Sequence, residues 1–147
     1  MAKTLADIAA ELRRIDFCML TTRAQDGSIA GRPMSNNQEV DYDGDSWFFS
    51  YDDAHTVADI GRDPSVGLSY RGVEEASGAP GLFVHVEGEA RLVRDKAAFA
   101  EHWDRSLDRW FLQGVNTEGL VMISVKARRL HYWDGEDEGE IALPNPA

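Results

Sequence analysis

The first hydrophobic residues of the chain have the spacing of an α-helix. They recur at steps of three and four residues, at Leu5, Ile8, Ala9, Leu12 and Ile15. Thr4 precedes the first of them and Asp7 follows Thr4 by three residues, which is the pattern of a capped helix start. We therefore predict a helix from about residue 5 that buries this apolar face.

Alternation of apolar and polar residues replaces the helical spacing after residue 16 and predicts strands. Residues 17–23 and 28–36 lie on either side of Asp26-Gly27, a dipeptide typical of tight hairpin turns because glycine accepts the positive φ that such turns need. An aromatic segment over residues 46–51 has the composition of a third strand. The first third of the chain is therefore predicted as one helix followed by three strands.

A short helix is predicted after the aromatic strand. Asp52 or Asp53 is placed to cap it, and Val57 and Ile60 are spaced to face inward. Gly61 with Asp63-Pro64 is expected to end it. This helix separates the aromatic strand from the strands that follow.

Two further strands are predicted on either side of a loop. Apolar residues alternate over 66–70, the composition of residues 71–81 is that of a loop, and residues 82–93 form a long strand. Gly88 interrupts this long strand and is expected to mark a bulge or a sharp bend.

The C-terminal third is predicted to contain one more helix and one more strand. Asp95 is placed to cap a helix with a single apolar stripe, formed by Phe99, Trp103, Leu107, Trp110 and Phe111. The last strand spans roughly residues 120–133, and residues 135–147 are expected to be an acidic, flexible C-terminal tail. Residues 1–134 show no repeat or composition break, so we predict one mainly β domain, an antiparallel barrel with flanking helices.

Composition and charge narrow the classes of partner and compartment. The 15 Lys and Arg residues against 26 Asp and Glu residues give a formal charge of −11, which disfavours nucleic acids and anionic membranes as partners. The single cysteine, Cys18, lies in an apolar run and is predicted to be a buried thiol. The N-terminal segment resembles neither a signal peptide nor a membrane span, so we expect a cytoplasmic protein.

Several common catalytic and binding motifs are absent from the sequence. It contains no phosphate-binding Gly-Lys-Ser/Thr, no Gly-x-Gly-x-x-Gly and no Gly-x-Ser-x-Gly. The four histidines are too scattered for a metal-binding motif, so no metal site is predicted.

Arg32 is the residue whose position most needs an explanation. It lies in a strand otherwise directed toward a core, and a desolvated guanidinium needs an anionic partner. Ser50 and the helix near His55 would bring hydroxyl and backbone donors beside it, and aromatic walls would suit a flat, phosphorylated ring system. On these residues alone, the alternative is that Arg32 pairs with a nearby aspartate at a strand edge.

Six short segments occur in an order and spacing that together form a fairly specific pattern. They are residues 19–22, 31–34, 47–50, 63–70, 84–90 and 132–134. The pattern, which covers about residues 5–134, resembles the pyridoxamine 5′-phosphate oxidase-like flavin-binding proteins and is most similar to their general stress protein branch. The resemblance implies a split β-barrel that forms a homodimer and holds FMN in clefts between the two subunits.

The resemblance also implies which residues meet the cofactor. Arg32 falls where the family uses an arginine for the FMN phosphate, Phe49 and Ser50 fall beside the phosphate and ribityl chain, and Trp110 and Trp133 fall in segments that line the flavin cleft. The full implied set is Arg32, Pro33, Met34, Phe49, Ser50, His55, Trp110 and Trp133. The residues that bind the substrate phosphate in true pyridoxamine 5′-phosphate oxidases have no convincing counterparts here, so that activity is not carried over and no catalytic residue is assigned.

His55 departs from the family pattern, which commonly has a lysine at this place. A histidine is only partly charged at neutral pH. Loss of one full cation beside a phosphate costs on the order of 1–2 kcal/mol of binding free energy. We therefore expect FMN to bind more weakly than in lysine-bearing relatives and to bind more tightly as the pH falls toward 6.

Three functions remain open on the sequence. The first is an FMN-dependent oxidoreductase acting on a small organic molecule, with NADH or NADPH as candidate electron donors. The second is a flavin-binding stress protein without turnover. The third is a flavin-free dimeric barrel that acts through its acidic surface and tail.

Overall fold

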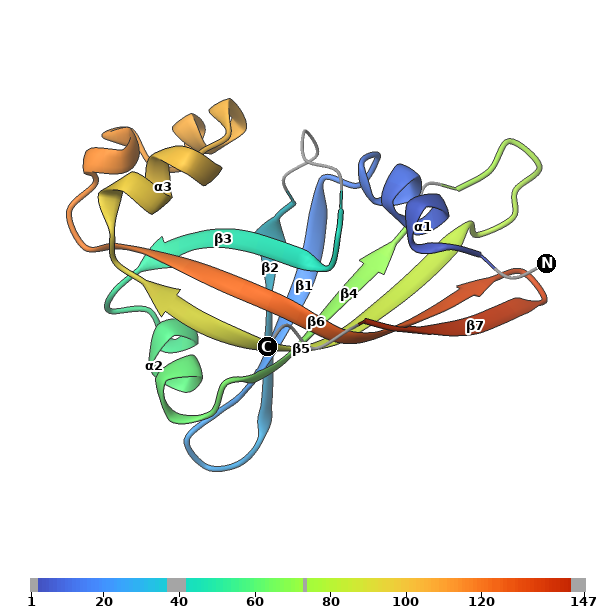
Figure 1. The fold of residues 1–147 in the computed structure, drawn as a ribbon, viewed down its shortest axis with the longest axis horizontal. Helices are drawn as coiled ribbons and strands as arrows, with labels where there is room; N and C mark the ends of the chain where they lie inside the picture. The colour runs from blue at the N-terminus through green and yellow to red at the C-terminus, as the bar shows by residue number, and fades with distance from the viewer. Residues whose placement is uncertain (1–2, 37–41, 73, 144–147) are drawn as a thin grey trace.

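One antiparallel sheet forms the body of the protein. The computed structural model describes residues 3–36, 42–72 and 74–143. Within them, the strand order is β2-β1-β4-β5-β6-β3, and β7 also pairs with β6 (Figure 1). The strands are β1 (Phe17–Arg23), β2 (Ile29–Ser35), β3 (Asp45–Tyr51), β4 (Ser65–Arg71), β5 (Leu82–Val93), β6 (Leu120–Asp134) and β7 (Asp137–Ala142). The mainly β class predicted from the alternation is confirmed.

The long strand β6 supports two shorter strands along one of its edges. β5 pairs with β6 along nearly its whole length, whereas β3 pairs with residues 120–126 and β7 with residues 129–134. Because β5 occupies one edge of β6, β3 and β7 follow one another along the other edge. The register between β5 and β6 shifts at Gly88, which confirms the predicted bulge.

In the part of the chain that the structure describes, three α-helices lie outside the sheet, and α1 and α3 cover opposite ends of it (Figure 1). They are α1 (Leu5–Leu12), α2 (His55–Arg62) and α3 (Lys96–His102). The Thr4 hydroxyl accepts a hydrogen bond from the Asp7 amide, and the Asp7 carboxylate accepts one from the Thr4 amide, which confirms the predicted cap of α1. Two short 3-10 helices, η1 (Arg105–Arg109) and η2 (Gly114–Asn116), follow α3.

The N-terminus of α2 differs from the prediction of an aspartate cap. The N-cap residue is Ala54, and among the described residues no side chain accepts a hydrogen bond from the first turn. Asp52 instead forms an ion pair with Arg94, with the carboxylate oxygen 2.7 Å from the guanidinium nitrogen. The first turn of α2 is therefore left without a side-chain acceptor.

The apolar stripe expected on one long helix is divided between two elements. Trp103 has an extended backbone with ψ of 132°, so α3 ends at His102. Phe99, Leu107 and Phe111 are still buried in one cluster with Phe49 of β3. The spacing therefore identified residues that pack together, while the break at Trp103 makes the segment fold back over β3.

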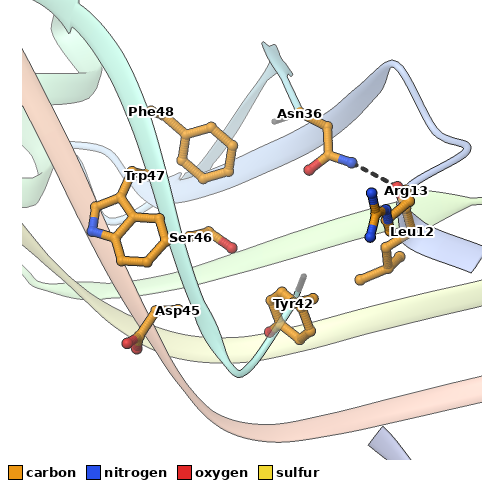
Figure 2. A pocket seen from close by; sticks show the side chains of 8 residues that line it. All are labelled: Leu12, Arg13, Asn36, Tyr42, Asp45, Ser46, Trp47 and Phe48. Atoms are coloured by element: carbon orange, nitrogen blue, oxygen red, sulfur yellow. Dashed lines mark hydrogen bonds between the residues drawn. The ribbon is translucent and has the colours of Figure 1, made fainter. Parts of the chain in front are cut away.

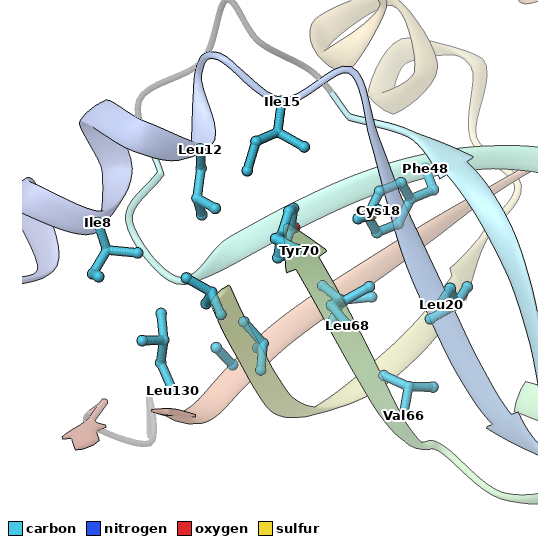
Figure 3. Packing of buried hydrophobic residues seen from close by; sticks show 14 of the residues in the cluster. Ile8, Leu12, Ile15, Cys18, Leu20, Phe48, Val66, Leu68, Tyr70 and Leu130 are labelled. Atoms are coloured by element: carbon cyan, nitrogen blue, oxygen red, sulfur yellow. The ribbon is translucent and has the colours of Figure 1, made fainter. Parts of the chain in front are cut away.

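The main core lies inside the curved sheet. Figure 3 shows Ile8 and Leu12 of α1 beside the strand residues, with Leu68 and Tyr70 on β4. Cys18 is buried in this cluster, which confirms the prediction for the thiol. Burial raises the pKa of the Cys18 thiol from its ordinary value near 9 to about 12.

The prediction of a flexible tail from residue 135 is wrong for residues 137–142. These residues form β7, in which Ile141 packs against the main core and Glu140 forms an ion pair with Arg129 at 3.0 Å. The acidic strand pairs because β6 supplies basic partners and because Gly135, with φ of +64°, permits a two-residue hairpin turn. Residues 144–147 of the expected tail lie outside the described residues.

Candidate functional site

A cleft of about 340 Å³ lies between the two end strands of the sheet, β2 and β3. Its walls come from residues 33–35 of β2, residues 48–51 of β3, Phe17 of β1, and Leu107 with residues 110–111 around η1. Its size lies within the range of small-molecule sites, and most of its wall is apolar and aromatic. β2 and β3 do not pair with each other in the described sheet, and the cleft lies in this split of the barrel.

Packed aromatic rings hold one wall of the cleft against β3. The ring centroids of Phe49 and Trp103 are 4.8 Å apart in an edge-to-face arrangement, and those of Tyr51 and Phe111 are 5.3 Å apart. The Trp103 indole N–H donates a hydrogen bond to Asp108 at 2.8 Å. These contacts fix the segment after α3, so the wall that contains Trp110 is part of a packed unit.

Arg32 directly precedes the cleft residue Pro33, but its side chain lies on the inner face of β2, on the same side as its buried pairing partner Leu20. Its Nη1 donates a hydrogen bond to the Thr22 hydroxyl at 2.7 Å, and its Nη2 is 3.6 Å from an Asp59 carboxylate oxygen. The Thr22 hydroxyl in turn donates to the same Asp59 oxygen at 2.8 Å. The alternative reading of Arg32, an ion pair with a nearby aspartate, is therefore present in the structure.

Asp59 does not neutralise the cluster around it. Its second oxygen lies 2.8 Å from a guanidinium nitrogen of Arg62, so two guanidinium groups share one carboxylate. The side chain of Asp59 is only 8% exposed and that of Arg32 is 21% exposed. The cluster of Arg32, Asp59 and Arg62 therefore carries one surplus positive charge in partly desolvated surroundings, which favours a further anion.

The structure brings together five of the eight predicted cofactor residues in the cleft wall: Pro33, Met34, Phe49, Ser50 and Trp110. Arg32 is the chain neighbour of Pro33 and belongs to the charged cluster. His55 is exposed at the start of α2, four residues after the cleft residue Tyr51. Trp133 does not line this cleft, because it lies on the outer face of β6, where its ring stacks on His131 at 4.3 Å.

Several residues of the site were not identified from the sequence. Asp59 and Thr22 are buried polar residues at positions that an apolar pattern would occupy, and this mismatch was the available signal. Phe111 lies against Tyr51 of β3 in the cleft because the segment after α3 folds back, which spacing alone does not reveal.

A second, smaller cavity of about 30 Å³ lies between the end of α1 and β3 (Figure 2). The Asn36 amide donates a hydrogen bond to the Leu12 carbonyl at its edge. Burial raises the pKa of Tyr42, whose hydroxyl has no hydrogen-bond partner among the described residues. The cavity has room for about one water molecule, so it does not compete with the larger cleft as a cofactor site.

Two common features are missing from residues 3–36, 42–72 and 74–143. No group of three or more His, Cys, Asp and Glu side chains in these ranges is arranged to hold a metal ion. None of the helices in the same ranges is long and apolar enough to cross a membrane.

The sequence profile of the family described as "Pyridoxamine 5'-phosphate oxidase like" matches residues 3–143. The chain belongs to this family. No protein of curated function matches the chain. The family assignment confirms the resemblance found in the six segments.

Several solved structures share the split-barrel fold of this chain. A protein related to general stress protein 26 from Clostridium acetobutylicum has a TM-score of 0.77 at 13% identity, with 95% of this chain and 94% of that chain covered. General stress protein 26 from Bacillus anthracis has a TM-score of 0.73 at 19% identity, covering 92% and 95%. A heme binding protein from Mycobacterium smegmatis has a TM-score of 0.74 at 14% identity, covering 97% of this chain and 59% of that chain.

Proposed function

We propose that this protein binds FMN in the cleft between β2 and β3 and uses it as an oxidoreductase acting on a small organic molecule. The observation that carries the proposal is the surplus positive charge of the Arg32–Asp59–Arg62 cluster beside an aromatic cleft. A flavin mononucleotide combines a flat ring with a phosphate, and this site offers one surface for each part.

The residues present fit such a cofactor. Phe49, Tyr51 and Trp110 supply apolar surface for the ring, and Ser50 supplies a hydroxyl at the same wall. Arg32 supplies a planar guanidinium suited to bind a phosphate through two hydrogen bonds. The N-cap Ala54 makes no side-chain hydrogen bond, and the N–H groups of Val57 and Ala58 already donate to its carbonyl, so the N–H groups of His55 and Thr56 are the ones that would serve an anion there.

The bound flavin would accept and donate the electrons of the reaction. The protein's part is to hold and orient it and to exclude water from the aromatic cleft. We assign no side chain to proton transfer, and the same site would equally serve a flavin-binding protein without turnover.

We further propose that two copies of the chain associate through the outer face of the sheet. Met19, Phe83 and Trp133 are large apolar side chains that are each 38–44% exposed. The strand register places them on one face. Met19 pairs with Ser69 and Ser69 pairs with His85, and Phe83 lies two residues before His85 on the same side of β5. A second copy would cover this surface, and the C2 symmetry common in homodimers would bring the same face of each chain together.

The direct test is the absorption spectrum of protein purified without added cofactor. A flavin spectrum, with FMN released on denaturation, supports the proposal. A heme spectrum, or protein that stays colourless and does not bind added FMN, contradicts it. Arg32→Ala should weaken FMN binding, whereas Arg23→Ala is the matched control because Arg23 forms an exposed pair with Asp63 at 3.4 Å.

Turnover and association need separate measurements. Rapid bleaching of the flavin by NADH or NADPH, followed by reoxidation in air, supports the oxidoreductase, and no bleaching supports binding alone. Sedimentation should give twice the chain mass of 16.4 kDa, and Trp133→Glu should shift the protein toward the monomer.

A further inference from the structure

We propose that Thr22 is a positioning residue that turns one edge of the Arg32 guanidinium toward the cofactor's phosphate. The inference rests on the proposed function and assigns a role to a residue that does not itself meet the phosphate. Thr22 is 2% exposed and lies on β1, next to the strand that carries Arg32.

The hydrogen bonds of Arg32 are all made by one nitrogen. Nη1 donates to the Thr22 hydroxyl at 2.7 Å and lies 3.4 Å from the carbonyl oxygens of Leu20 and Ala30. Among the described residues, neither Nε nor Nη2 donates a hydrogen bond, although Nη2 lies 3.6 Å from Asp59. The N–H groups of Nε and Nη2 form the side-on edge of the guanidinium, and that edge remains available for a bidentate contact with an anion.

Asp59 determines which way the Thr22 hydroxyl points. A hydroxyl has a single proton, and the proton of Thr22 is directed to the Asp59 carboxylate at 2.8 Å. A lone pair of the same oxygen therefore faces Arg32 and accepts from Nη1. Because Asp59 is held at 2.8 Å by Arg62, this orientation does not depend on the longer contact between Asp59 and Arg32.

The consequence is a preorganised arginine. A free arginine side chain loses rotamer entropy when it binds an anion, and part of that loss is avoided when the guanidinium is already fixed. Thr22 fixes it without adding charge, so its contribution can be separated from electrostatics by removing the hydroxyl alone. Only ligands with a phosphate should depend on it.

The experiment compares FMN with riboflavin, which has the same ring but no phosphate. We expect Thr22→Val to weaken FMN binding about tenfold, which is about 1.4 kcal/mol of binding free energy, and to leave riboflavin binding unchanged. Thr22→Ser should restore FMN binding because it keeps the hydroxyl. Thr21→Val is the matched control, because the side chain of Thr21 is next to Thr22 in the chain but faces the other side of β1.

The results distinguish this inference from the proposed function. If the wild-type protein binds FMN but Thr22→Val binds it equally well, or loses FMN and riboflavin affinity alike, the positioning role is overturned and FMN binding stands. If the wild-type protein binds neither flavin, the proposed function fails and the inference fails with it. Thr22→Ala removes the same hydroxyl with less bulk and replaces the valine variant if that variant does not fold.

Discussion

The buried thiol of Cys18 should make the protein lose stability in alkaline solution. Burial raises its pKa from near 9 to about 12, while a contact with the Tyr70 hydroxyl lowers it by less. In the unfolded chain the thiol loses its proton from about pH 9, whereas in the folded protein it keeps the proton until about pH 12. The folded state therefore binds the extra proton, and the free energy of unfolding falls as the pH rises between these values.

The size of this effect follows from the difference of about three pH units. Each unit corresponds to about 1.4 kcal/mol, so up to about 4 kcal/mol is lost between pH 9 and 12, and about 2 kcal/mol is lost by pH 10.5. Cys18→Ala removes this loss, although it lowers stability at pH 7 by leaving a small cavity. The two tyrosines near Cys18, Tyr42 and Tyr70, also have a raised pKa, but both proteins retain them.

The assay is urea unfolding of the wild type and Cys18→Ala between pH 7 and pH 10.5, with a reducing agent present. The difference in unfolding free energy between the two proteins should move by about 2 kcal/mol in favour of the variant from pH 8.5 to 10.5. Two parallel curves over this range would refute the reasoning. Slow labelling of the native thiol by iodoacetamide, compared with fast labelling in urea, provides an independent check of burial.

Three further predictions concern single residues. His55→Lys should tighten FMN binding because lysine places a full positive charge at this position, and isothermal titration that gives the two proteins equal affinity would contradict this. Gly88→Ala should destabilise the protein by about 1–3 kcal/mol in urea, because a Cβ would lie 2.5 Å from the Lys126 carbonyl oxygen; an unchanged midpoint would refute it. Gly61→Ala, in the helix α2 with nothing within 4 Å of the added Cβ, should raise stability by about 0.5–1 kcal/mol in the same assay, and a lower midpoint would count against this account.

Elements formed by local interactions were predictable from the sequence. The capping box at Thr4, the hairpin at Asp26-Gly27 and the alternation along β5 each involve residues close in the chain, and all three occur in the structure. The helix expected after Asp95 fails at Trp103, because the ring packs against Phe49 from a distant strand. Tertiary packing overrides helical spacing there.

The C-terminal strand was missed although its turn carried a recognisable signal. Asp134-Gly135 is the same kind of dipeptide as Asp26-Gly27, and Gly135 with Glu136 forms a tight turn between the paired residues Asp134 and Asp137. The acidic composition of the following residues indicated a solvent-exposed tail. Their basic partner Arg129 lies on β6 and becomes a neighbour only when the two strands pair, so the sequence did not reveal this contact. An acidic segment can therefore be predicted as a tail or as a strand only when the strand that pairs with it is known.

In the candidate site, too, the local feature was predictable from the sequence and the contacts between distant elements were not. Arg32 was recognised because a charge in an apolar strand is a local anomaly, and both of its expected partners, an aspartate and an anion, could be named. Its actual arrangement depends on Thr22 and Asp59, which belong to other elements. Sequence reasoning could identify the arginine but could not choose how its donors are divided between protein and ligand.

The pairing of β7 with the second half of β6 also bears on the solubility of the molecule. A chain ended at Asp134, the boundary that composition suggests, would leave the backbone N–H and C=O groups of residues 129–134 without partners along that edge. Open edges of this kind accept strands from other chains and start polymerisation. The last strand therefore protects the barrel from self-aggregation, and its exposed glutamates discourage a further strand from adding to it.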